Sequence, residues 1–190
     1  MPRHLIVAAT REEAAYVPDG LPVVVTGVGK PAGAVATARA LAELASVEDL
    51  HVVNIGTAGA LRDGVAGLHH PSVVLNHEIS ADALRTLGYD PRERLEVGIP
   101  ALGAAEEGPV LATGDVFVTD PVVRNRRADV AQLVDMEGYA VAFAAQQFGV
   151  PAHLVKYVSD NADEGAYEWP ELVDACARVL GTWLEDNLPG

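Results

Sequence analysis

The chain has 190 residues, of which 49% are hydrophobic, a length and composition that suit one globular domain with a sizeable core. Its 13 Lys and Arg residues are outnumbered by 27 Asp and Glu residues, and the resulting net charge of −14 argues against a nucleic-acid partner. No apolar run approaches the roughly 18 residues of a membrane-spanning helix, so we expect no membrane partner.

Cysteine and histidine usage limits the kinds of site to consider. The single cysteine, Cys176, excludes an intramolecular disulfide and a cysteine-based metal site. The histidines form no HxxxH or HExxH pattern, so we expect no metal. The first apolar run is followed at once by charges and lacks a cleavage-site pattern. We therefore interpret it as a first strand instead of a signal peptide, and we expect a cytoplasmic location.

Apolar runs rich in Val, Ile and Leu alternate with helical patterns along most of the chain. The runs are continuously apolar, which favours strands that are covered on both faces. In chain order, the expected elements are strands at 4–10 and 21–27, a helix at 31–45, strands at 51–56 and 72–77, a surface loop around 85–108, strands at 109–118 and 133–136, a helix at 138–149, a strand at 153–160 and a helix at 169–188. This order predicts a layered α/β fold. Without a linker or a long repeat, we expect a single domain over residues 1–190.

Glycines follow two of the expected strands, and ligands of open α/β sheets bind at such carboxyl ends. Gly27, Gly29 and Ala32 come close to a GxGxxG pattern, which fits either a dinucleotide site or a tight strand-to-helix turn. A lone match of this kind is weak, and we expect no cofactor. The stretch IGTAGA predicts a second glycine loop with the Thr57 hydroxyl, and two such loops side by side can hold a sugar or phosphate oxygen.

Carboxylates also gather at the strand ends. Glu137 has apolar residues on both sides, so its carboxylate is expected to accept hydrogen bonds from hydroxyls or from a cation. Glu13 is expected in the first turn of a helix, where an ordinary helix-start acid is the alternative. For Asp160 the alternative is an Asx turn or a helix cap. Phe117 is either a core residue or a platform for a base, and we interpret Asp135 as structural.

Five motifs occur in an order that resembles the nucleoside phosphorylase and nucleosidase superfamily, most closely the bacterial methylthioadenosine/S-adenosylhomocysteine nucleosidases. They are TGVGK, NIGTAGAL, TGDVFV, DMEGYAVA and VSDNADE. The glycine motifs are individually weak, whereas Met-Glu before a helix followed by Ser-Asp after the next strand is more specific. The resemblance runs from about residue 4 to residue 185. It implies a mixed central sheet flanked by helices, in an assembly that is usually a dimer or larger, and we expect a homodimer.

At the sugar end, the resemblance assigns roles to five residues. Glu137 would hold the ribose 2′- and 3′-hydroxyls, with Met136 packed beside the sugar. Thr57 and Gly59 would line the sugar side of the site. Glu13 corresponds to the residue that activates the attacking water.

At the base end, the resemblance assigns four more. Asp160 corresponds to the acid that hydrogen-bonds N7 of a purine and promotes its protonation, and Ser159 to a neighbour that supports this acid. Phe117 would stack on the base, while the backbone of Val118 would read its Watson–Crick edge. Cleaving an N-glycosidic bond develops positive charge on the sugar and negative charge on the base, and two acids with these separate roles fit that chemistry.

The stretch after the first expected strand indicates whether water or phosphate attacks the sugar. Superfamily phosphorylases present glycine and arginine there, whereas ATREEAA places Glu12 and Glu13, whose charge would repel phosphate. We therefore favour a purine nucleosidase acting on a nucleoside substrate with water. Arg11 and Lys30 keep a phosphorylase open as the alternative, and a non-catalytic nucleoside-binding protein is another.

Departures from the family pattern leave the substrate open. The region after NHEISAD is abbreviated, and Asp135, Met136 and Glu137 stand where the family often has Glu-Met-Glu. Trp169 lies near the expected place of an aromatic lid residue. Methylthioadenosine, S-adenosylhomocysteine, 5′-deoxyadenosine and futalosine-type nucleosides all remain candidates.

Overall fold

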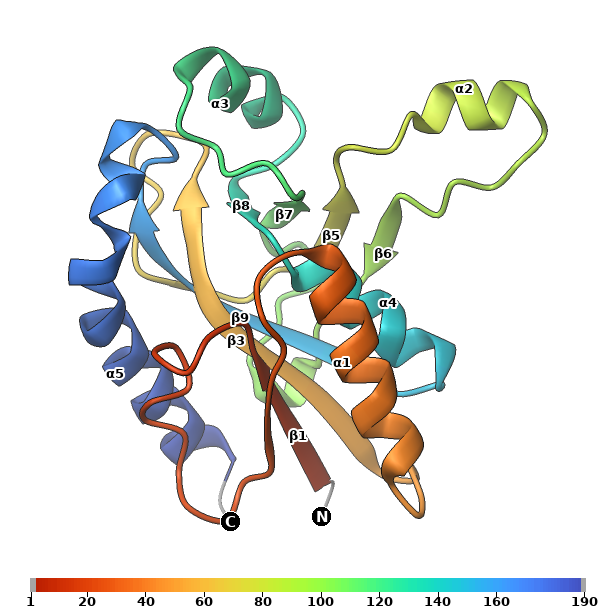
Figure 1. Cartoon of the computed structure of the whole chain (residues 1–190), viewed down its shortest axis with the longest axis vertical. Coiled ribbons are helices and arrows are strands. Elements are labelled where there is room, and N and C mark those ends of the chain that lie inside the picture. Colours follow the sequence, from red (N-terminus) through yellow and green to blue (C-terminus); the bar gives the residue numbers. More distant parts are fainter. Residues whose placement is uncertain (1–2, 189–190) are drawn as a thin grey trace.

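A computed structural model describes residues 3–188 and contains a nine-stranded mixed sheet with helices on both faces (Figure 1). The α/β fold expected from the alternating pattern is confirmed. The strands are β1 (Arg3–Ala8), β2 (Val23–Val25), β3 (Leu50–Ala60), β4 (Leu68–His69), β5 (Val73–Asn76), β6 (Arg94–Glu96), β7 (Val110–Thr113), β8 (Leu133–Asp135) and β9 (Ala152–Asp160). The α-helices are α1 (Lys30–Glu43), α2 (Ala81–Thr86), α3 (Pro121–Ala128), α4 (Gly138–Gln147) and α5 (Trp169–Asn187), with 3-10 turns at Pro100–Leu102 and Glu164–Glu168.

The long strand β3 organises the sheet, whose main path runs β2-β1-β3-β8-β7-β5-β6. β3 pairs in parallel with β1 over its first half and with β9 along most of its length, and its last two residues pair antiparallel with β8. β5, β7 and β8 run parallel to one another, whereas β4 and β6 pair antiparallel with their neighbours. In Figure 1, α5 covers one face of this curled sheet, and α1 and α4 cover the other.

Successive residues of β1 show why its sequence is continuously apolar. Leu5 and Val7 pack into the core beneath α1 and α4, whereas Ile6 and Ala8 pack into the core beneath α5. A central strand with helices on both faces has no face left for polar residues. The expectation of strands covered on both sides is therefore confirmed for β1.

Two expected strand boundaries were wrong, and both concern the site. The stretch IGTAGA is not a loop, because β3 continues to Ala60, pairing with β9 as far as Gly59 and with β8 at Gly59 and Ala60. Conversely, the run expected as a strand at 109–118 leaves the sheet after Thr113. A Cβ added at Gly114 would lie 2.3 Å from Nε2 of His77, so glycine permits a close approach there and the chain turns away.

Two further expectations were wrong. Glu13 does not begin a helix, because residues 11–16 form a series of turns. The region 85–108, expected as a surface loop, contains the end of α2, strand β6 and a 3-10 turn. Only Leu95 of β6 is buried, so a three-residue strand between charged residues gives too short a pattern to recognise.

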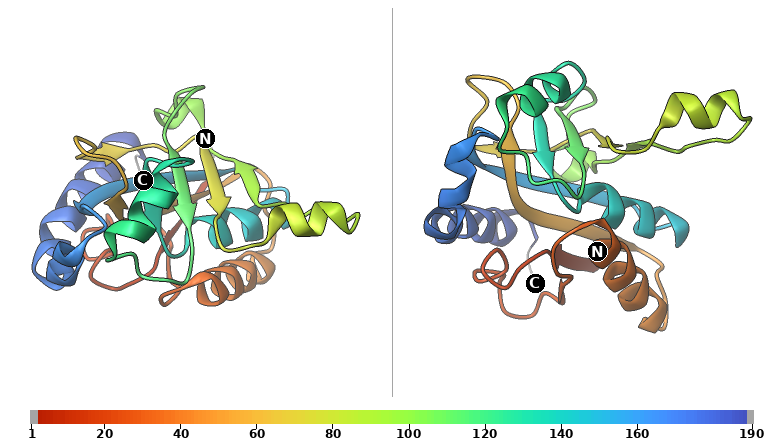
Figure 2. Two further views of the ribbon diagram at one scale, coloured as in Figure 1. Left: turned by 90° about the horizontal axis from the view of Figure 1, so that it is seen from above. Right: turned by 45° about the horizontal axis from the view of Figure 1, so that its top comes forward.

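The segment between β5 and β6 extends away from the body of the molecule as an arm that carries α2 (Figure 2). No residue of α2 is buried, and Leu87 and Tyr89 beyond it are largely exposed. No helix within residues 3–188 has the length and apolar character that a membrane span needs.

Candidate active site

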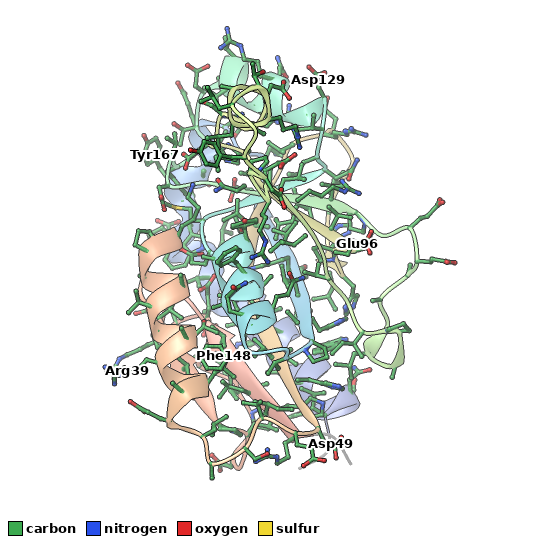
Figure 3. All side chains as sticks on the ribbon, turned by 90° about the vertical axis from the view of Figure 1, so that its right-hand side faces the viewer. Arg39, Asp49, Glu96, Asp129, Phe148 and Tyr167 are labelled. Atoms are coloured by element: carbon green, nitrogen blue, oxygen red, sulfur yellow. The ribbon has the colours of Figure 1, made fainter. Side chains whose placement is uncertain are left out.

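A cavity of about 490 Å³ lies beyond the carboxyl ends of the central strands. Figure 3 shows its wall residue Tyr167 near one end of the molecule, with Asp49, which precedes β3, at the other. The volume suits a small-molecule ligand. The structure brings to its wall all nine residues singled out from the sequence: Glu13, Thr57, Gly59, Phe117, Val118, Met136, Glu137, Ser159 and Asp160.

Glu13 is 5% exposed, and both of its carboxylate oxygens accept hydrogen bonds. Oε1 accepts from the backbone N–H of Thr57 at 2.8 Å and from its hydroxyl at 3.0 Å. Oε2 accepts from the N–H of Thr10 at 3.2 Å. The Thr57 hydroxyl in turn accepts from Nε1 of Trp169 at 2.8 Å. The carboxylate is therefore fixed in the cavity wall as an acceptor.

The turns that carry Glu13 are held by α5. A Cβ added at Gly181 would lie 2.5 Å from the backbone oxygen of Tyr16, so the helix and the turn are in direct contact. The Tyr16 hydroxyl donates to Asp174 at 2.7 Å, and the guanidinium of Arg178 lies over the Tyr16 ring. The helix thus supplies the rigidity that the irregular segment lacks.

Glu137 stands at the N-cap position of α4 and is 8% exposed. Its Oε1 accepts from the backbone N–H of Gly29 at 2.7 Å. Within the described residues 3–188, no donor reaches the other oxygen. Burial and the nearby charge of Asp135 raise the pKa of Glu137 to about 7, and the Gly29 hydrogen bond opposes this shift. The free oxygen leaves Glu137 able to bind ligand hydroxyls.

Asp135 also lines the cavity and is paired with Lys156, a residue that the sequence interpretation missed. Its Oδ2 lies 2.9 Å from the Lys156 ammonium, and both side chains are only 2% exposed. Asp135 also accepts from the Thr113 hydroxyl at 2.6 Å and from the Gly138 N–H at 2.9 Å. Burial acts to lower the pKa of Lys156, but the charges of Asp135, Glu13 and Glu137 outweigh it and raise the pKa. A lysine inside the apolar run HLVKYV was the available signal.

Asp160 ends β9 and forms an Asx turn. Its Oδ1 accepts from the N–H of Ala162 at 2.8 Å and its Oδ2 from the Ser159 hydroxyl at 2.7 Å. A Cβ added at Gly59 would lie 3.0 Å from Oδ1 of Asp160, so the missing side chain leaves room for the carboxylate. The competing interpretation of Asp160 as a turn-forming residue is thus correct, and the carboxylate also faces the cavity.

Aromatic and apolar side chains line the same end of the cavity. Phe117 is 47% exposed and meets Tyr167 edge-on, with 6.1 Å between ring centroids. Val118 is buried in a small core with Ala162 and Val134, so its side chain anchors the loop. Phe117 is therefore outside the core, which leaves its face available to a ligand.

The two cations that kept a phosphate site open do not line the cavity. Arg11 is exposed, and the Lys30 ammonium donates to Glu78 at 2.5 Å and to Asn76 at 3.0 Å. Among the cavity-lining residues of the described chain there is no Lys, Arg or His. Residues 3–188 also contain no group of three or more His, Cys, Asp or Glu side chains placed to hold a metal ion.

Solved structures share this fold. A 5′-methylthioadenosine/S-adenosylhomocysteine nucleosidase from Helicobacter pylori, solved with butyl-thio-DADMe-Immucillin-A, matches 99% of this chain and 98% of its own, with a TM-score of 0.84 and 24% identity. Futalosine hydrolase from the same organism matches 97% of this chain and 96% of its own, with a TM-score of 0.81 and 22% identity.

Sequence comparison identifies the family as well as the fold. The 5′-methylthioadenosine/S-adenosylhomocysteine nucleosidase of Shewanella frigidimarina is 33% identical in an alignment of 166 positions that covers 76% of this chain and 70% of the relative. The enzyme of the same name from Shewanella oneidensis is 31% identical over 84% of this chain and 79% of its own length. The family model described as Phosphorylase superfamily matches residues 19–181. The chain therefore belongs to the phosphorylase superfamily.

Proposed function

We propose that this protein is a purine nucleosidase that hydrolyses the N-glycosidic bond of a 5′-modified adenosine-type nucleoside. The observation that carries the proposal is that three carboxylates, Glu13, Glu137 and Asp160, line one cavity in different environments, beside a fourth, Asp135, which is paired with Lys156. The sequence relatives named as nucleosidases support the same reaction.

Each carboxylate has a step to perform. Glu137 accepts hydrogen bonds from the ribose hydroxyls through its free oxygen, and Met136 packs beside the sugar. Glu13 accepts a proton from water as the water oxygen bonds to C1′. The C1′–N9 bond breaks, its electron pair goes to the base, and the base takes a proton from solvent at N7, where the Asp160 carboxylate accepts a hydrogen bond from the new N7–H. Phe117 stacks on the base, and the backbone of Val118 reads its edge.

Hydrolysis is favoured over phosphorolysis by the charge of the cavity wall. A phosphate dianion bound beside Glu13 would face a buried carboxylate and no lining cation among the described residues. Lys30 is held by Glu78 and cannot turn inward without leaving that carboxylate unpaired. Water has no charge to be repelled.

The substrate class follows from the relatives and remains a proposal. Methylthioadenosine, S-adenosylhomocysteine and 5′-deoxyadenosine are the first candidates. The structural match to futalosine hydrolase makes a futalosine-type nucleoside the second. A phosphorylase and a non-catalytic nucleoside-binding protein are alternatives that the same assay separates.

The test measures release of free base from each nucleoside in phosphate-free buffer. Asp160→Asn and Glu13→Gln are each expected to lower turnover by about 10²- to 10⁴-fold, the usual contribution of a positioned acid or base. Asp163→Asn and Glu12→Gln are the matched controls, because these neighbouring acids lie outside the cavity lining. Both controls are expected to retain the parent rate.

Three outcomes would overturn the assignment. No base released from any candidate, with or without phosphate, would favour a binding protein. Strict dependence on phosphate with formation of a sugar 1-phosphate would establish a phosphorylase. Full turnover in Glu13→Gln would remove the proposed role of Glu13 with water.

We also propose a homodimer in the cytoplasm. Exposed apolar side chains at the cavity, Val28, Val116, Phe117 and Tyr167, support a covering partner of the same chain. The lone buried Cys176 fits a reducing compartment. Light scattering on the purified protein tests the first, since a mass near 19.9 kDa would contradict it. Cell fractionation tests the second.

A further inference from the structure

The loop that follows β7, residues 114–118, carries the proposed base platform Phe117 but has left the sheet. Two of its backbone N–H groups need acceptors that a strand would otherwise supply. The Asp115 N–H donates to Oε2 of Glu78 at 2.8 Å, and the Val116 N–H donates to Oε1 of the same carboxylate at 3.1 Å. One side chain thus takes the place of a neighbouring strand.

Glu78 is itself held in place. The Lys30 ammonium donates to its Oε2 at 2.5 Å and to Oδ1 of Asn76 at 3.0 Å, and these side chains are mostly buried. Burial would raise the pKa of Glu78, but the hydrogen bonds from Lys30 and from the two amides lower it to about 2. The carboxylate is therefore ionised, and it accepts from three donors.

The start of α1 contacts both Glu78 and the loop that Glu78 holds. The backbone N–H of Lys30 donates to Oδ1 of Asp115 at 2.7 Å, so the helix end also binds the loop directly. The preceding N–H, from Gly29, donates to Glu137. One helix terminus therefore fixes the loop at the base end of the cavity and the carboxylate at the ribose end.

We propose that Glu78, held by Lys30, is a positioning residue that presents the loop 114–118 to the purine. The inference rests on the proposed function. Neither side chain lines the cavity, so Glu78 acts through the loop and not on the substrate. Loop placement matters because a base stacks well only on a ring that is already held in the bound geometry.

Glu78→Gln is the sharpest change, because it keeps the shape and removes one acceptor. A glutamine has a single acceptor oxygen, and its NH₂ group would face an N–H or the ammonium. The expected result is a KM at least 10-fold higher with a kcat within about threefold of the parent. Hydrogen exchange of a peptide spanning residues 114–118 is expected to be at least 10-fold faster.

Glu93→Gln is the matched control. Glu93 lies on the same arm and pairs with Arg85, and its side chain is exposed to the same extent as that of Glu78, 22% against 23%. It is expected to leave KM and the exchange of the 114–118 peptide at parent values. If Glu78→Gln fails to fold, Lys30→Met tests the same set of hydrogen bonds between Lys30, Glu78 and the loop. It is expected to raise KM and to speed the hydrogen exchange of the 114–118 peptide.

An unchanged KM together with unchanged exchange in Glu78→Gln would overturn the inference. A fall in kcat as large as the rise in KM, together with faster hydrogen exchange over α5, would also overturn it. Such a result would indicate that Glu78 has a merely structural role. Failure of the proposed function is a separate result. It would appear as an inactive parent protein, in which the exchange of the 114–118 peptide still tests whether Glu78 holds the loop.

Discussion

At the residue scale, Asp135 and Glu137 lie two positions apart and meet opposite environments. Asp135 has a buried ammonium and two further donors, which stabilise its charge. Glu137 has one backbone donor and lies close to the Asp135 charge, which helps to raise its pKa to about 7. Two carboxyl groups with such different partners can take different roles. Asp135 is held by Lys156, whereas Glu137 is left with an oxygen for the ligand.

This difference predicts a pH dependence. The ionised Glu137 can accept from ribose hydroxyls with both lone pairs of its free oxygen, whereas the protonated form offers fewer acceptors. We expect kcat/KM to fall as the pH drops below about 7. Glu137→Gln should remove that inflection and raise KM about 10- to 100-fold, the equivalent of one hydrogen bond to a charged group. Rate profiles from pH 5 to 9 measure both, with Glu12→Gln as the control. An inflection that survives in Glu137→Gln would contradict the assignment.

At the element scale, one ion pair connects most of the structure under the cavity. Lys156 belongs to β9, Asp135 to β8, Thr113 to β7 and Gly138 to the start of α4. Removing one partner of a buried pair leaves the other charge without compensation, which costs more than the pair itself contributes. The pair therefore makes the relative placement of these four elements depend on two side chains.

Lys156→Met tests this dependence. It leaves the buried Asp135 carboxylate unpaired, so the free energy of unfolding should fall by about 3–5 kcal/mol. Adding Asp135→Asn should recover part of the loss, because the uncompensated charge is removed. Urea denaturation measures both. Arg39→Met is the control, since its partner Glu43 is exposed and its unfolding midpoint should stay near that of the parent. Equal unfolding midpoints for Lys156→Met and Arg39→Met would show that the buried ion pair contributes no more to stability than the exposed one.

The sequence predicted the elements that have a strong internal pattern. α1, α4 and α5 begin within a residue of their expected starts, because proline near the first position or a clear apolar stripe marks them. The short elements β4, β6, α2 and α3 were not anticipated. Few of their residues are buried, so their sequences carry little periodicity. The positions of β4 and β6 are set by pairing with β9 and β5.

The site shows the same division. The nine candidate residues meet at one cavity because carboxyl ends of neighbouring strands converge there, and their roles stay predictions. Lys156 and Glu78 were missed because their partners lie far away along the chain. Lys156 pairs with Asp135, and Glu78 accepts from the amides of Asp115 and Val116. A single sequence without a fold gives no way to bring such groups together.

At the scale of the whole molecule, several buried groups act in the same direction on stability in acid. Burial is the first cause that lowers the pKa of five histidines: His4, His51, His70, His77 and His153. Each binds its proton more readily in the unfolded chain, so its contribution to stability is lost as the pH falls below 6.5. The low pKa of Glu78 acts likewise between its ordinary value of 4.5 and about 2. Glu137 opposes them, since its raised pKa contributes stability that is lost as the pH rises through about 7.

These signs place the steep loss of stability below about pH 4.5. Between pH 7 and the isoelectric point near 4.6, protonation relieves the repulsion of a chain with net charge −14, and Glu137 takes its proton favourably. Below that point the net charge becomes positive, and both effects end. His153 and Glu78, whose pKa values in the folded state are about 3 and about 2, then dominate, and the folded state loses stability as the pH falls further.

Among the histidines, His153 is expected to contribute most to the loss of stability in acid. It is fully buried, its Nδ1 accepts from the Ile99 N–H at 3.0 Å, and its Nε2 lies 3.0 Å from Nδ1 of His70. Burial and the charge of His70 lower its pKa to about 3, so it costs about 1.4 kcal/mol for each pH unit between 6.5 and about 3. Urea denaturation at pH 7, 5.5, 4.5 and 3.5 should therefore show a smaller loss in His153→Gln, which keeps a donor and an acceptor without the titrating ring. His69→Gln, in the neighbouring strand β4, should follow the parent slope. If His153→Gln loses stability in acid as steeply as the parent, the loss comes from the surface charge of the molecule and not from its buried imidazole.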